Sequence, residues 1–266
     1  MKRYSHWFAA LAAIVLVISG LPTFEDAFQR NMAGGALVRF LLSRSRPDPS
    51  ELTKTISGLQ RWVSDQPDMS DSRTMLAQLY AAKGRSLYAR GARSEAIADL
   101  KMAWTNAPSL NLLNHDLGVA YAETGQPVLA MFYLKRQLEL HPEPWTWVYL
   151  GTLYLGMNQL DQAEASYRAA LTMTPYADDG AYDGLARVYF QIGAYSQAAD
   201  YARKAAELRP DRWDYWLDLA RASCGSGDSD QAVRAYERAF ALNPTSSALG
   251  QELDQAQARA CRSRGP

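Results

Sequence analysis

The chain has 266 residues, of which 48% are hydrophobic, enough to bury one elongated domain or two compact ones. Its 28 basic and 28 acidic residues cancel, so it lacks the net positive charge typical of nucleic-acid binding proteins. The two cysteines form no CxxC pair and the three histidines are far apart. Since a zinc site needs about four clustered ligands, we expect no metal and no cofactor.

An uncharged apolar run follows the basic residues Lys2 and Arg3. Counted from residue 6 to residue 24, at about 1.5 Å per helical residue, its length approaches the roughly 30 Å core of a bilayer. We therefore predict a transmembrane signal anchor over residues 6–24, after a short basic tail at 1–5. Two alternatives stay open: a cleaved signal peptide, whose apolar region has about 7–15 residues, and a buried helix.

The orientation of this span is only weakly biased, because Lys and Arg occur on both sides of it. A basic start before an apolar run is how export signals begin. We therefore expect a single-pass protein of the bacterial inner membrane with its larger part in the periplasm. If the domain is exported, its compartment is oxidising.

Residues 25–76 are predicted to form juxtamembrane helices or a degenerate repeat. The apolar residues between 24 and 41 fall near one helical face, which suits either the membrane interface or packing against the rest of the chain. The segment Asp48–Glu51 combines a capping acid, a proline in the first turn and a glutamate, which is typical of a helix start. We expect that helix to end before Pro67.

The remaining sequence is periodic. Prolines recur with spacings of 34, 33, 35 and 34 residues, at Pro108, Pro142, Pro175, Pro210 and Pro244. A turn-forming residue precedes each proline at a constant distance: Gly91, Gly125, Asn158, Gly193 and Gly227. A constant distance within each unit, with variation only in the linking loops, is what stacked helix–turn–helix modules require.

The units resemble the tetratricopeptide repeat (TPR), whose pattern runs W-x2-L-G-x2-Y, then Ala, an aromatic residue and Pro. The most similar unit contains Trp147, Leu150, Gly151, Tyr154, Ala163, Tyr167, Ala170 and Pro175. The resemblance implies an all-α TPR solenoid of about five helix-turn-helix repeats with a C-terminal capping helix. We place the repeats at 77–110, 111–143, 144–178, 179–212 and 213–246, and the capping helix and tail at 247–266. Small residues such as Gly151 and Ala163 would let paired helices approach closely.

In TPR proteins the first helix of each unit lines a concave surface that binds an extended peptide or a partner helix. Carried over by position, the resemblance implies a partner-binding groove containing Trp145, Tyr149, Asp183, Arg187, Phe190, Asp218 and Arg221. The alternative is that the aromatic residues pack on adjacent helices and the charged ones form surface ion pairs, worth about 0–1 kcal/mol each. Lysine is absent from this surface, so the carboxylate clamp of Hsp70/Hsp90 cochaperones is not expected.

Cys224 and Cys261 are a possible disulfide, because each lies near the end of one of two helices expected to stack side by side. Two unpaired cysteines are the alternative, and the expectation for a cytosolic domain.

No nucleophile–base constellation or phosphate-binding glycine loop occurs, so we expect no enzyme. The sequence thus predicts a membrane-anchored scaffold that binds a protein partner of an envelope secretion, export or assembly complex. The alternative is a periplasmic chaperone or quality-control factor that binds exported polypeptides.

Overall fold

The computed structural model describes residues 48–65, 70–173 and 178–258, and within these ranges it contains helices and no strand. The predicted tail at 1–5, the predicted anchor at 6–24 and Cys261 lie outside the described residues. Among the described helices, none combines the length and the apolar composition that a membrane crossing requires.

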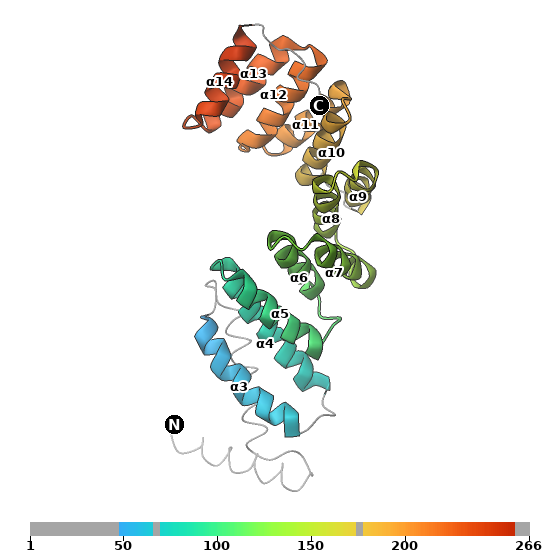
Figure 1. Cartoon of the computed structure of the whole chain (residues 1–266), viewed down its shortest axis with the longest axis vertical. Helices are drawn as coiled ribbons and strands as arrows, with labels where there is room; N and C mark the ends of the chain where they lie inside the picture. Colours follow the sequence, from blue (N-terminus) through green and yellow to red (C-terminus); the bar gives the residue numbers. More distant parts are fainter. Residues whose placement is uncertain (1–47, 66–69, 174–177, 259–266) are drawn as a thin grey trace, which may run out of the picture. The chain divides into compact units, whose positions relative to one another are not determined.

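The chain divides into two compact units, the first ending at Tyr133 and the second beginning at Leu134. The first unit contains α3 (Pro49–Asp65), α4 (Ser70–Ala89), α5 (Arg93–Asn106), α6 (Leu113–Glu123) and the beginning of α7 (Pro127–Leu140). Helices α3, α4 and α5 lie side by side (Figure 1). As predicted, a helix begins at Pro49, where the missing proline N–H costs no hydrogen bond.

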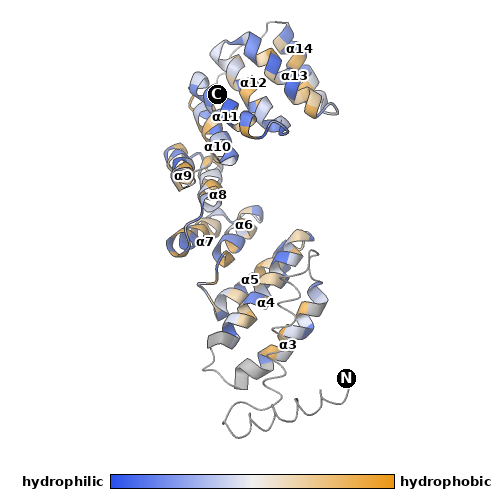
Figure 2. Ribbon diagram, turned by 180° about the vertical axis from the view of Figure 1, so that it is seen from behind, coloured by the Kyte–Doolittle hydropathy of each residue, from blue (hydrophilic) through white to orange (hydrophobic). Residues whose placement is uncertain are grey.

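The second unit contains the end of α7 and three helical hairpins followed by a last helix. Its helices are α8 (Pro144–Gly156), α9 (Leu160–Met173), α10 (Asp179–Gln191), α11 (Tyr195–Leu208), α12 (Trp213–Ser226), α13 (Ser229–Leu242) and α14 (Ser247–Gln257). Hydrophobic and hydrophilic residues alternate around these helices (Figure 2). Their apolar sides form one continuous core that includes Tyr167, Leu185 and Leu219. The predicted all-α array of hairpins with a C-terminal helix is confirmed for the described residues.

The turns inside the hairpins share one geometry. The five turn residues singled out by the proline spacing all have positive φ: Gly91 86°, Gly125 73°, Asn158 58°, Gly193 81° and Gly227 86°. The residue after each one donates its N–H to a carbonyl five positions earlier, as from Ala194 to Tyr189 at 2.9 Å. This six-residue closure satisfies the last carbonyls of the first helix and favours glycine at the left-handed position. The predicted turns are therefore confirmed.

Close helix approach depends on glycines around one aromatic ring. A Cβ atom on Gly151 would lie 2.8 Å from Cε1 of Tyr167, and a Cβ on Gly184 would lie only 2.2 Å from it. Ala163 is fully buried in the same core. The expectation that Gly151 and Ala163 serve helix contacts is confirmed, and Tyr167 is held between α8 and α10.

Candidate partner-binding face

Three aromatic residues of the predicted groove lie exposed on first helices of the second unit. Trp145 and Tyr149 on α8 are 45% and 43% exposed, and Phe190 on α10 is 38% exposed. Fully packed aromatic residues of the same unit, such as Tyr167 and Tyr215, are buried. The three side chains therefore leave large apolar surfaces in contact with water, although Tyr149 also has a contact within the chain.

The structure brings four of the seven predicted residues together. Arg187, Phe190, Asp218 and Arg221 line one hollow of about 320 Å³, together with Ala186, Gln191 and Tyr195. The ring of Tyr195 meets that of Phe190 edge to face, with centroids 5.3 Å apart. Trp145, Tyr149 and Asp183 are not among the lining residues, although Asp183 lies 3.1 Å from Arg187. Sequence reasoning missed Tyr195, because it belongs to the second helix of its hairpin.

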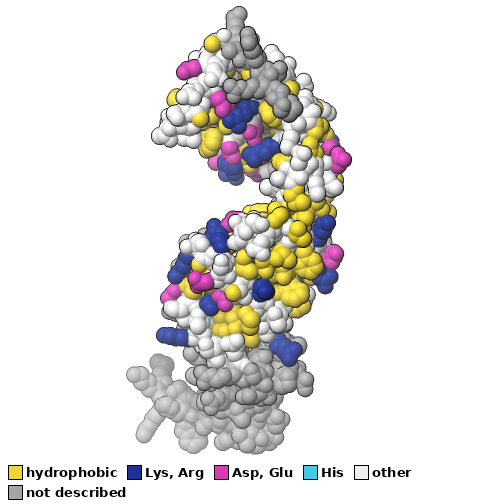
Figure 3. All heavy atoms as spheres, in the orientation of Figure 1, with side chains coloured by type: hydrophobic (Ala, Val, Ile, Leu, Met, Phe, Trp, Pro, Cys, Tyr) yellow, Lys and Arg dark blue, Asp and Glu magenta, His cyan; other side chains and the backbone are white. Residues whose placement is uncertain are grey.

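The arginines of this face pair with acids on the next first helix. Arg187 on α10 lies 2.9 Å from Asp218 on α12. Arg221 on α12 donates two hydrogen bonds to Glu252 on α14, at 2.7 and 3.1 Å. In the first unit, Arg85 on α4 lies 2.6 Å from Asp116 on α6. Basic and acidic side chains accordingly lie next to one another over the α10–α14 part (Figure 3).

All three pairs join residues 31 positions apart. This spacing is about one helical turn shorter than one repeat. Each arginine therefore pairs with an acid on the first helix of the next repeat, about one turn before the position equivalent to its own. We call the two pairs of the second unit, Arg187–Asp218 and Arg221–Glu252, the arginine ladder. Surface ion pairs among the charged groove residues were one of the two sequence-based readings, and they are present. An acid placed 31 residues after each arginine was the sequence signal for them.

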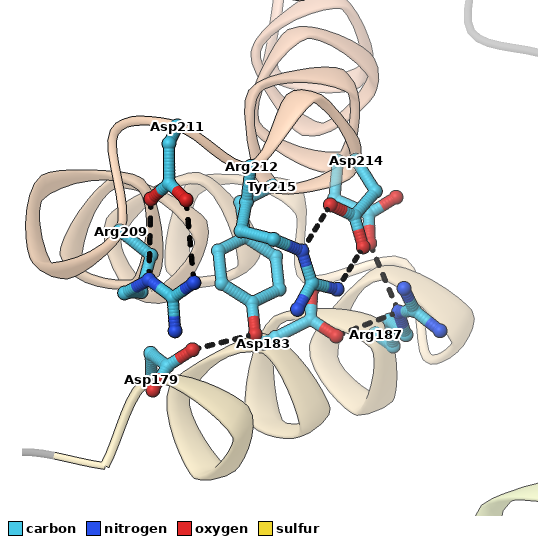
Figure 4. Close-up of polar contacts among 9 residues, drawn as sticks. Asp179, Asp183, Arg187, Arg209, Asp211, Arg212, Asp214 and Tyr215 are labelled. Atoms are coloured by element: carbon cyan, nitrogen blue, oxygen red, sulfur yellow. Dashed lines mark hydrogen bonds and ion pairs between the residues drawn. The ribbon is translucent and has the colours of Figure 1, made fainter.

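Asp183 is the most perturbed carboxyl group of the site. Its Oδ2 atom lies 3.1 Å from Arg187, whereas its buried Oδ1 accepts no hydrogen bond from the described residues. Burial raises the pKa of Asp183 to about 8, against the opposing effect of Arg187 and with the help of the Asp218 carboxylate. Asp183 and Arg187 lie next to each other on α10 (Figure 4), and Arg187 also pairs with Asp218.

A second polar group fixes the start of α12 against α10. Tyr215 donates its hydroxyl hydrogen to Asp179 at 2.8 Å. Arg212 pairs with Asp214 at 2.5 Å, and its guanidinium carbon lies 4.6 Å from the centre of the Tyr215 ring (Figure 4). Burial, followed by the bond to Asp179, raises the pKa of the Tyr215 hydroxyl. These contacts join the beginning of α12 to α10, so their role is structural.

A cysteine and a histidine are two further side chains with distinctive chemistry. Cys224 is disulfide-bonded, and Cys261, its predicted partner, lies outside the described residues, so the pair stays a prediction. His115 is half-buried on α6, where burial and then Arg85 lower its pKa to about 4. Within the described residues no group of three or more His, Cys, Asp or Glu side chains is placed to hold a metal ion.

Comparison with known proteins agrees with this architecture. Two models of the tetratricopeptide repeat family match residues 150–212 and 190–258. The Hsp70-Hsp90 organizing protein of Triticum aestivum is 29% identical over 99 residues, which cover 37% of this chain and 17% of that protein. The chain thus spans under a fifth of that relative's length.

Solved structures show the same fold at low sequence identity. A structure of pilF from Pseudomonas aeruginosa superimposes with a TM-score of 0.63 at 16% identity, covering 88% of this chain and 99% of that one. YrrB, described as a TPR protein with an unusual peptide-binding site, gives a TM-score of 0.56 at 14% identity, covering 74% of this chain and 97% of that one. The tetratricopeptide repeat models thus match the part of the chain from residue 150 to residue 258, and the solved structures share its fold.

Proposed function

We propose, from the tetratricopeptide repeats of this chain, that it is a scaffold that binds a protein partner on the first helices of its second unit. The observation that carries the proposal is the exposure of Trp145, Tyr149 and Phe190 on two of these helices. Aromatic side chains each bury about 150–250 Å² when covered, and they dominate the energetics of protein interfaces. Covering all three would therefore supply the centre of an interface.

A macromolecular ligand suits this face better than a small molecule. Trp145 and Tyr149 do not line the hollow that contains Phe190, so the exposed aromatic surface extends beyond one pocket. An extended peptide or a helix can cover several such positions along successive repeats. The peptide-binding site ascribed to YrrB is a precedent within the same fold.

Membrane attachment through residues 6–24 is part of the proposal, with the repeats in the periplasm and the partner in an envelope complex. The length and lack of charge of that segment support it. The test is carbonate extraction of native membranes followed by sequencing of the mature N-terminus. An anchored protein stays in the pellet and begins at Met1 or Lys2. Release in soluble form, with a mature N-terminus after residues 19–27, would show that the segment is a cleaved signal.

The alternative function is a chaperone that binds exported polypeptides loosely. Similarity to the Hsp70-Hsp90 organizing protein covers 37% of this chain, and the lysine expected of a carboxylate clamp is absent from the groove residues. Purification of the full chain from native membranes in mild detergent distinguishes the two. A scaffold brings down one partner in stoichiometric amount, whereas a chaperone brings down many clients in small amounts.

The binding face is tested by replacing both exposed aromatic residues of α8, Trp145→Ala with Tyr149→Ala. If both are hot spots, partner affinity should fall by at least about 2 kcal/mol, roughly thirtyfold. The matched control is Val128→Ala with Phe132→Ala, two exposed apolar residues of α7 in the first unit. Full recovery of the partner by the α8 variant, with loss in the α7 variant, would move the interface away from the proposed face.

A further inference from the structure

A hollow beside Phe190 is part of the proposed binding face. Its apolar wall consists of Phe190 and Tyr195, and Ala186 contributes a third apolar side chain. At about 320 Å³ it stands at the lower end of the roughly 300–1,000 Å³ typical of ligand pockets. A hollow of that size holds one large side chain rather than a whole peptide segment.

The arginines at this hollow are already neutralised from within the chain. Arg221 is held by both carboxylate oxygens of Glu252, and Glu252 Oε2 also accepts a hydrogen bond from Tyr236 at 3.0 Å. Arg187 lies between Asp183 and Asp218. Each guanidinium group at the hollow therefore already has a carboxylate partner within the chain.

This balance disfavours an acidic ligand. A carboxylate from a partner would have to displace Asp218 or Glu252 from its arginine, exchanging one ion pair for another of the same kind. Exposed pairs are worth only about 0–1 kcal/mol, and the displaced internal acid would be left without its partner. A basic side chain from a partner is disfavoured for the same reason, because Asp218 and Glu252 already pair with arginines of the chain.

We infer that the hollow formed by Phe190, Tyr195, Arg187 and Arg221 binds one uncharged aromatic or large aliphatic side chain from a segment of the protein partner. This inference rests on the proposed function and specifies its ligand chemistry. The apolar wall supplies the attraction. The arginine ladder supplies a rigid, neutral rim whose guanidinium planes pack against an aromatic ring without needing a charge on it.

The test is selection of random twelve-residue peptides, displayed on phage, against the immobilised full chain. Selected peptides should share one Phe, Tyr, Trp, Leu or Met and show no excess of Asp or Glu. Phe190→Ala should weaken binding of a selected peptide by about thirtyfold or more, the usual threshold of an interface hot spot. Trp213→Ala is the matched control, since Trp213 is also 38% exposed but does not line the hollow.

Two more variants sharpen the result. Gln191→Trp, at an exposed lining position, fills the hollow without removing a packed side chain and should also abolish binding. Glu252→Gln keeps the shape of the side chain but leaves Arg221 without its anionic partner. That variant should therefore select peptides with an acid beside the apolar anchor, which the wild-type chain does not.

Three outcomes contradict the inference. Acid-rich consensus peptides from the wild-type chain would show that the arginines remain available to ligands. Equal binding to the wild type, Phe190→Ala and Gln191→Trp would place the peptides elsewhere. Failure to select any peptide would show that the hollow is no anchor site. None of these decides the proposed function, which is tested separately by partner capture with the α8 variants.

Discussion

Replacing Gly184 by alanine tests how the hairpins of the second unit pack. In most helix interiors this change is favourable by about 1 kcal/mol, because alanine is the better helix former. Here the new Cβ would lie 2.2 Å from two ring carbons of Tyr167 and 2.6 Å from a third. Carbon atoms in contact are ordinarily about 3.5–4.0 Å apart, so the ring would have to move by more than about 1 Å.

The ring has no space for that movement. Tyr167 is 2% exposed, Gly151 lies in contact with it, and its hydroxyl shares a hydrogen bond with Thr152 Oγ1 at 3.2 Å. Overpacking of this kind costs about 1–3 kcal/mol. At the upper end of that range, and after subtracting the gain in helix propensity, we expect a net loss of about 2 kcal/mol in the free energy of unfolding.

Thermal unfolding followed by circular dichroism measures the effect. The expected fall in Tm is about 4–8 °C, from roughly 2–4 °C per kcal/mol for a protein of this size. Gly250→Ala in α14 is the control. Its Cβ would lie 3.6 Å from the side chain of Phe240, an ordinary contact distance, so this change should be neutral or stabilising. A Gly184→Ala variant as stable as the wild type would refute the packing argument. Adding Tyr167→Leu should make the cost of Gly184→Ala smaller, because the two sites are coupled.

Three further predictions follow from backbone and charge. The native pKa of Asp183 is about 8 against an ordinary 3.8, so the native state retains a proton that the unfolded chain releases. The free energy of unfolding should therefore fall as pH rises from about 4 to about 8. Asp183→Asn should flatten that fall in denaturant titrations, and an unchanged slope would contradict the raised pKa of Asp183. Gly193→Ala should cost about 1 kcal/mol, because its φ of 81° disfavours a side chain, whereas Asn158→Gly should stabilise slightly; equal effects in thermal melts would argue against turn strain. His115 should stay neutral down to about pH 4 in an NMR titration, and a midpoint near 6.5 would show that it is more exposed than the structure has it.

The sequence predicts the fold well because the repeat is encoded locally. Constant spacing from the turn residues to the prolines fixes the length of each hairpin, and the left-handed turn positions follow from Gly91, Gly125, Gly193 and Gly227 with Asn158 as the one substitute. Alanines such as Ala163 likewise mark close contacts between the two helices of one hairpin. These features depend on neighbours within one repeat, so they can be read without knowing how the repeats stack.

The candidate site was predictable in part, because its properties arise between repeats. Position along the first helices placed Phe190, Arg187 and Arg221 on one surface, and in the structure all three line one hollow. It did not separate them from Trp145 and Tyr149, which lie outside the hollow. Pairing of Arg221 with Glu252 and burial of Asp183 depend on contacts between helices of different repeats. The steric role of Gly184 likewise depends on Tyr167 of the preceding hairpin.

Site-specific photo-crosslinking in cells tests most directly whether the first helices of the second unit bind a protein. A benzophenone amino acid replaces Tyr149 on α8 or, as the control, Val128 on α7, both exposed positions of the full-length chain. The account predicts that position 149 crosslinks to one protein in high yield, and that position 128 does not. Crosslinking of that protein from position 128 alone, or of no protein from position 149, would contradict it.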